Sequence, residues 1–193
     1  VTRTAIFSTD AASQTFQFER VSRWQQFWEF VWEGVHHIWI GYDHILFLIS
    51  LLLPAVFFLQ GRAWQPVGGF RAAFWDVLKS VTSFTLAHSI TLSLAALEII
   101  RLPSRWVESA IAASVVLAAL NNIWPLVHNK RWVVAFVFGL IHGFGFASVL
   151  GDLGLPRNAL VLALVGFNVG VELGQLAIVS AFLPIAYFLR DTL

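Results

Sequence analysis

The sequence predicts an all-α integral membrane protein, a bundle of about five transmembrane helices preceded by an interfacial helix. Three observations lead to this fold class. The 193 residues are 58% hydrophobic and only 12% charged, whereas a soluble domain is about 45–50% apolar and about 25% charged. The mean hydropathy is +0.75. Several runs of roughly 20 residues contain no Lys or Arg, which is long enough to cross a bilayer.

The composition also excludes several functions. The chain has no cysteine, which excludes a disulfide-stabilised scaffold and a thiol redox centre. Its net charge of +1 provides no basic surface for nucleic acid. The partners that we expect are therefore membrane lipid and other membrane components, with no nucleic acid.

The segment before residue 36 is predicted to precede the membrane-spanning part. Residues 1–23 are polar and begin without Met. We interpret them as the tail of an extramembrane N-terminal region, with a frayed terminus as the alternative. In residues 24–35, Trp24, Trp28 and Trp32 recur every four residues beside charged residues. This pattern predicts a helix at the membrane interface.

The transmembrane domain is predicted to cover residues 36–193. Five runs in it lack Lys and Arg: residues 36–59, 80–100, 106–127, 132–150 and 159–189. Trp106, Trp124 and Trp132 mark ends of the third and fourth runs, as expected of an aromatic belt. The last run is longer than a bilayer requires, so we expect it to tilt or to break near Pro184, which would give six spans.

The basic residues indicate an orientation. With the N-terminus outside, Lys and Arg are slightly more numerous at the cytoplasmic ends of the spans than at the outer ends. An exported N-terminal region agrees with this orientation. We therefore predict a multi-pass protein of the bacterial inner membrane with its N-terminus outside.

Ionisable residues inside the spans point to a function. The runs lack basic residues, yet they contain acids and histidines: Asp43, Glu98, Glu108, Glu172, His36, His37, His44, His88 and His142. Such groups are costly in hydrocarbon unless paired or coordinated, so they usually line a site or a pathway. Without a basic partner they need a proton or a bound cation. Because the chain has no Cys or Met, nitrogen and oxygen ligands remain, which suit Ni, Co, Zn, Mn, Fe or Cu(II).

The first span carries His37, Asp43 and His44. On a straight helix His37 and His44 lie about 10 Å apart along the axis, since seven residues are nearly two turns. A shared ion would require a kink at Gly41; otherwise the two histidines mark two stations on one path. Asp43 is either a ligand or the acceptor that orients a histidine, with a helix-capping Asp as the alternative.

Two further histidines lie in the second and fourth spans. His88 shares a helix face with two threonines, so a buried histidine satisfied by hydroxyl groups is the alternative there. His142 lies beside Gly139 and Gly143, a pair of small residues that allows another helix to approach closely. Packing accounts for these glycines but not for the histidine.

The last span has two different faces. One face carries polar groups: Asn168, Glu172 and Gln175. The opposite face carries a ridge of glycines: Gly166, Gly170 and Gly174. The polar face predicts a side turned to the interior, with Glu172 as a functional group or a protonated structural acid. The glycine ridge predicts packing against a neighbouring helix or a second protomer.

The remaining polar residues are assigned to the cation pathway or to groups that orient the ligands: His36, Glu98, Glu108, Asn168 and Gln175. Glu98 and Glu108 flank the short connection at Pro103 and are predicted at the outer mouth. Ion pairs with Arg101 and Arg105 are the alternative for these two acids.

Five ordered motifs resemble the HupE/UreJ family of membrane proteins. They are His37-x5-Asp43-His44-Ile45-Leu46-Phe47-Leu48, Phe84-Thr85-x2-His88-Ser89-x-Thr91-Leu92, Glu108-Ser109-x-Ile111-Ala112, Phe138-Gly139-Leu140-Ile141-His142-Gly143-Phe144-Gly145-Phe146 and Asn168-x-Gly170-Val171-Glu172-Leu173-Gly174-Gln175. The resemblance runs over residues 36–175. Members are regarded as nickel or cobalt permeases associated with hydrogenase and urease maturation, and the branch with a long exported N-terminal region fits best. The resemblance implies metal ligands at His37, Asp43, His44, His88, His142 and Glu172.

The leading hypothesis is a divalent transition-metal permease for Ni or Co. Two other functions would use the same metal-binding residues. One is a membrane accessory or sensor protein of a partner complex, and the other is an intramembrane metal-dependent hydrolase. No His-Glu-x-x-His motif is present, so an enzyme is the less favoured hypothesis. Five spans are few for a complete carrier, which favours a homo-oligomer or an accessory subunit.

Overall fold

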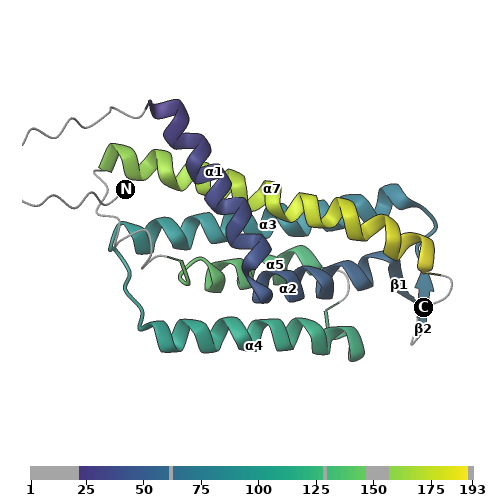
Figure 1. The fold of residues 1–193 in the computed structure, drawn as a ribbon. Coiled ribbons are helices and arrows are strands. Elements are labelled where there is room, and N and C mark those ends of the chain that lie inside the picture. Colours follow the sequence, from purple (N-terminus) through teal and green to yellow (C-terminus); the bar gives the residue numbers. More distant parts are fainter. Residues whose placement is uncertain (1–21, 61–62, 128–129, 147–156, 191–193) are drawn as a thin grey trace, which may run out of the picture.

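The computed structural model describes residues 22–60, 63–127, 130–146 and 157–190, and these residues are helical apart from one short hairpin and the connections. The elements are α1 (Arg23–Ile40), α2 (Tyr42–Leu52), η1 (Leu53–Val56), β1 (Phe57–Gln60), β2 (Ala63–Pro66), α3 (Phe70–Ala96), α4 (Ser104–Ile123), α5 (Arg131–His142) and α7 (Arg157–Leu189). The predicted all-α class is confirmed. Figure 1 shows α1 crossing the bundle over α7, with α4 at one edge, where it packs against α2 and α5.

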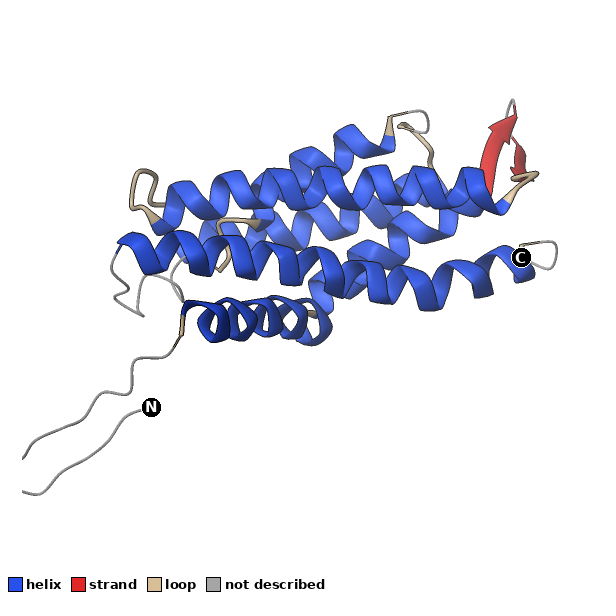
Figure 2. Ribbon diagram, turned by 90° about the horizontal axis from the view of Figure 1, so that it is seen from above, coloured by secondary structure: helices blue, strands red, loops and turns tan. Residues whose placement is uncertain are grey.

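The hairpin lies at one end of the bundle. Strands β1 and β2 are antiparallel, with Phe57 opposite Pro66. Figure 2 places them at the same end as the C-terminal end of α7. They connect η1 to the start of α3.

The number of spans differs from the prediction. Within the described ranges, α4 and residues Ala159–Leu189 are long and apolar enough to cross a membrane, and the bent pair α1 and α2 counts as a third span if it is one unit. Five spans are therefore not confirmed. Helix α3 has 27 residues, but its Ser and Thr residues, its one histidine and its charged residues lower its hydropathy. Helix α5 is apolar but has only 12 residues.

Helix α7 is continuous. It runs for 33 residues with Pro184 inside it, so the break that would have given a sixth span is absent from this helix. At 1.5 Å per residue it is about 50 Å long, longer than a hydrocarbon core of about 30 Å. A tilt or an extension beyond the bilayer accommodates this excess.

The first predicted span is broken at Gly41. Helices α1 and α2 are bent by 72° there, because Gly41 adopts an extended conformation with φ −77° and ψ 99°. The Gly41 N–H donates to the carbonyl oxygen of His37 at 3.1 Å and ends α1. The kink that the sequence left open is therefore present.

Helix α1 begins at Arg23, where the Ser22 hydroxyl accepts a hydrogen bond from the Gln25 N–H at 3.1 Å. It passes through residues 24–35 without interruption, and the tryptophans at its N-terminal end are exposed. The boundary between an interfacial helix and the transmembrane domain stays a prediction. The predicted extramembrane tail falls almost wholly in residues 1–21, outside the described residues.

Glycines bring α1 and α7 into close contact. A Cβ on Gly170 would collide with the carbonyl oxygen of Val31, and a Cβ on Gly34 would collide with the carbonyl oxygen of Phe167. The indole N–H of Trp39 also donates to the carbonyl oxygen of Gly174 at 3.3 Å. The glycine ridge of α7 thus faces α1 of the same chain.

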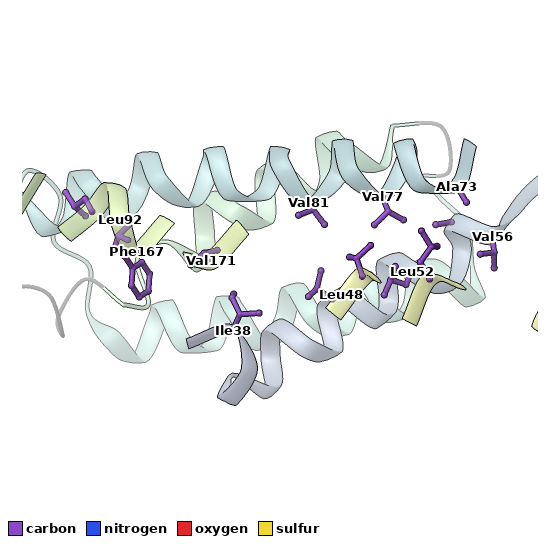
Figure 3. Packing of buried hydrophobic residues seen from close by; sticks show 14 of the residues in the cluster. Ile38, Leu48, Leu52, Val56, Ala73, Val77, Val81, Leu92, Phe167 and Val171 are labelled. Atoms are coloured by element: carbon purple, nitrogen blue, oxygen red, sulfur yellow. The ribbon is translucent and has the colours of Figure 1, made fainter. Parts of the chain in front are cut away.

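Two apolar clusters form the core. The larger joins α1, α2, η1, α3 and α7, and Figure 3 shows part of it. The smaller contains Phe47, Leu51, Phe84, Ala118 and Ala135. The ring of Phe167 in the larger cluster lies 5.3 Å from that of His37, and the ring of Phe84 in the smaller lies 6.2 Å from that of His44. The histidines therefore lie where the two clusters meet.

Candidate metal centre

Five of the predicted ligands come together where α1, α2, α3 and α5 meet. They form two groups of three donors, His37 with His44 and His88, and Asp43 with His44 and His142. In each group the donor atoms lie within 4.8 Å of one another. His44 belongs to both groups.

The bend at Gly41 brings His37 and His44 together. Their ring centroids are 4.7 Å apart, whereas a straight helix would separate the two residues by about 10 Å along its axis. Helix α3 adds His88, whose ring centroid lies 6.4 Å from that of His37. The C-terminal end of α5 adds His142, at 5.3 Å from His44.

Asn168 on α7 determines which nitrogen of His88 carries the proton. His88 is fully buried, and its Nδ1 lies 3.3 Å from the Asn168 side-chain oxygen. The Asn168 amide nitrogen donates to the carbonyl oxygen of Leu164 at 2.8 Å, which identifies the other amide atom as the acceptor. His88 Nδ1 therefore donates, and Nε2 retains a lone pair. Within the described residues this buried Nε2 has no hydrogen-bond partner.

Ser114 on α4 has the same effect on His142. The Ser114 hydroxyl donates to the carbonyl oxygen of Ile111 at 2.7 Å, so at 2.8 Å it accepts from His142 Nε2. The lone pair of His142 is then on Nδ1, which is buried without a hydrogen-bond partner in the described part of the chain. This Nδ1 lies 3.9 Å from an oxygen of Asp43.

His44 has the same arrangement as His88 and His142, with Asp43 as the acceptor of its proton. His44 Nδ1 donates to the Asp43 carboxylate at 3.2 Å, and His44 Nε2 is buried without a hydrogen-bond partner among the described residues. Three histidines thus direct their protons to protein acceptors and leave lone pairs unpaired. Asp43 is the one carboxylate in the two groups and is 35% exposed.

The donor set fits a divalent transition-metal ion. Imidazole nitrogens and one carboxylate oxygen suit Ni, Co, Zn and related ions. Each group supplies three protein donors, which leaves coordination positions open as in sites that exchange their ligands. Asn168, Ser114 and Asp43 accept hydrogen bonds from His88, His142 and His44 and so orient their rings. Metal-bound histidines are commonly oriented by such hydrogen bonds.

Close packing of α5 on α3 positions His142. A Cβ on Gly139 would collide with the carbonyl oxygen of Phe84, and a Cβ on Gly143 would collide with the Thr91 hydroxyl and the carbonyl oxygen of His88. The two helices are therefore in backbone contact beside both histidines.

The other predicted site residues lie outside the two groups. Glu172 accepts a hydrogen bond from the Thr82 hydroxyl at 2.7 Å and lines a groove between α3 and α7. Gln175 is buried and accepts from the Thr85 hydroxyl at 3.1 Å. His36 and Glu108 are exposed, and Glu98 pairs with Arg101. Their roles as ligand or pathway residues stay predictions.

Sequence analysis did not single out Ser114. It is separated from His142 by 28 positions, and nothing in the local pattern of α4 distinguishes it from other helical serines. A buried serine opposite a histidine becomes visible only when α4 packs beside α5.

Replacing Gly41 with alanine is expected to weaken cation binding about 10-fold, the scale of a lost outer-shell contact. An added Cβ would lie 2.7 Å from His44 Nδ1 and 3.0 Å from an Asp43 oxygen, so both donors must move. The measurement is a nickel titration of the purified protein in detergent. Gly68→Ala is the matched control, since its Cβ would meet nothing within 4 Å. Equal affinity in the two variants would contradict this placement of His44.

The bundle and its donor groups define a class: helical proteins of membrane type with a candidate transition-metal centre. A family model described as HupE / UreJ protein matches residues 12–193, so the chain belongs to the HupE/UreJ family. No curated protein and no solved structure matches the chain. Membership confirms the resemblance seen in the five motifs and indicates a role related to nickel or cobalt transport.

Proposed function

We propose that the protein is a permease for Ni or Co in the bacterial inner membrane and that the ion binds at the two groups around His44. One observation carries this proposal. His44, His88 and His142 each have a buried nitrogen with a lone pair and no hydrogen-bond partner among the described residues. An unsatisfied buried polar group costs about 1–3 kcal/mol. A divalent cation satisfies such lone pairs.

The broken helix favours transport over purely structural binding. Transporters commonly bind their substrates where membrane helices are interrupted, because the interruption supplies ligands and a point of movement. Here the 72° bend between α1 and α2 lies between His37 and His44. A change in this bend moves one ligand relative to the other.

The orientation and the assembly are part of the same proposal. We place the N-terminus outside and expect a second copy of the chain or an accessory subunit to complete the carrier.

Glu172 and Asn168 line the groove between α3 and α7, and Asn168 also contacts His88. This contact supports a pathway role for the polar face of α7.

The test is uptake of radiolabelled nickel or cobalt into proteoliposomes. His37→Ala and His88→Ala are each expected to reduce the initial rate at least 10-fold, because each removes a donor from the first group. Tyr42→Ala is the control, since Tyr42 is an exposed neighbour of Asp43 outside both groups and has no predicted pathway role. Wild-type rates in both ligand variants would remove His37 and His88 from the transport site, whereas no uptake by the wild type would remove the permease hypothesis. Tight binding without uptake by the wild type would favour the accessory or sensor class.

A further inference from the structure

We propose that the protein binds one cation at a time and passes it between the two groups, with His44 as a ligand in each group in turn. The inference rests on the proposed function and adds a sequence of events at the site. The first station is defined as His37, His44 and His88, and the second station as Asp43, His44 and His142.

As a neutral ring, His44 serves one station at a time. A neutral imidazole has one N–H and one lone pair. With its proton on Nδ1, toward Asp43 at 3.2 Å, the lone pair is on Nε2. For Nδ1 to ligate instead, Nδ1 must first release its proton to Asp43 or water, and Nε2 must take up a proton to keep the ring neutral. His44 therefore completes one station and leaves the other with two donors.

The distances between the donor atoms also favour one bound ion at a time. Bonds of about 2.0–2.1 Å to nitrogen hold tetrahedral donors about 3.4 Å apart. In the second station His142 Nδ1 and Asp43 are 3.9 Å apart, and donors in either station are separated by up to 4.8 Å. A bound ion must draw its three donors together. Movement of His44 toward one station takes it away from the other.

The charges also disfavour two ions. Asp43 is the one carboxylate among the five donors, and the histidines are neutral when they ligate. Two divalent ions would place four positive charges around one negative charge in a mostly buried site. Their mutual repulsion is weakly screened there.

Each station has its own support. Asn168 on α7 orients His88 in the first station, whereas Ser114 on α4 orients His142 in the second. Along the chain, Gly41 and its bend lie between His37 on α1 and the residues Asp43 and His44 on α2. The two stations therefore share α2 but take their other ligands from different helices, α1 and α3 for the first and α5 for the second.

The first experiment measures stoichiometry by equilibrium dialysis of the full chain against nickel alone. One ion per chain is expected for the wild type and for His142→Ala, because the first station remains complete. Two ions per wild-type chain would overturn the proposal.

The second experiment compares uptake with binding. His142→Ala is expected to retain nickel at the first station but to reduce uptake at least 10-fold. Ser114→Ala is the milder variant, with uptake expected to fall about 10-fold while one ion stays bound. Ser109→Ala is the matched control, since its hydroxyl makes a comparable bond to the carbonyl oxygen of Arg105 at an exposed position of α4.

The outcomes separate the two proposals. If wild-type proteoliposomes take up no nickel or cobalt, the proposed function fails. If the wild type transports and the His142 and Ser114 variants transport equally well, the permease remains and the transfer between stations is wrong.

Discussion

Replacing His44 with alanine is expected to abolish uptake and to weaken nickel binding roughly 100-fold or more, beyond the 10–100-fold effect of losing an outer-shell contact. His44 is the residue that both three-donor groups share. Every other histidine in the site belongs to a single group, so its loss leaves three donors in the other. The His44 variant should therefore be the most impaired of the single histidine variants.

The measurements are a nickel titration in detergent and initial uptake rates in proteoliposomes. Tyr42→Ala is again the control, and a size-exclusion profile with circular dichroism establishes that each variant is folded. His44 is 4% exposed, so a small loss of thermal stability is compatible with the prediction. A folded His44→Ala protein with wild-type affinity would remove His44 from the ligand set.

Replacing Gly170 with alanine is expected to destabilise the bundle by about 3 kcal/mol or more, the upper part of the range for overpacking. The added Cβ would collide with the carbonyl oxygen of Val31. That oxygen is backbone and has no rotamer to adopt, so α1 itself must move away from α7. Because α1 carries His37, nickel affinity should fall together with stability.

A series along the same helix provides the control. A Cβ on Gly166 would lie 2.8 Å from the carbonyl oxygen of Phe27, and a Cβ on Gly174 would lie 3.2 Å from its nearest contacts. The loss of stability should decrease from Gly170→Ala to Gly166→Ala to Gly174→Ala. At Gly174 the gain in helix propensity, about 1 kcal/mol, offsets much of the mild crowding. Thermal unfolding in detergent that gives the reverse order would contradict the α1–α7 packing.

Much of the candidate site was accessible from the sequence. Histidines and acids in apolar runs without Lys or Arg indicate a cation site regardless of how the helices pack. His37, Asp43, His44, His88 and His142 were all singled out on this ground, and the structure brings them together. The five motifs indicated the family, which the match over residues 12–193 confirms.

The number of spans was less accessible, because hydropathy does not record where a polar side chain points. Helix α3 buries Ser80, Thr85, His88 and Thr91 inside the bundle, so these polar side chains lower its average hydropathy without lying on its outer surface. The end of α5 at His142 and the bend at Gly41 divide runs that look continuous in composition. A run without charges therefore does not always correspond to one straight helix.

Composition and spacing were sufficient to establish an apolar, helical chain whose internal ionisable groups are acids and histidines suited to a transition metal. Those properties depend on residue type and on neighbours within a helical turn or two. Tertiary packing alone decided that His44 serves two groups, that Asn168 and Ser114 determine the tautomers of His88 and His142, and that Glu172 lies apart. These relations depend on distances of a few ångströms between residues far apart in the sequence, such as Ser114 and His142 at 28 positions and Thr82 and Glu172 at 90. The close approach of helices at glycines and the bend at Gly41 contribute to those distances.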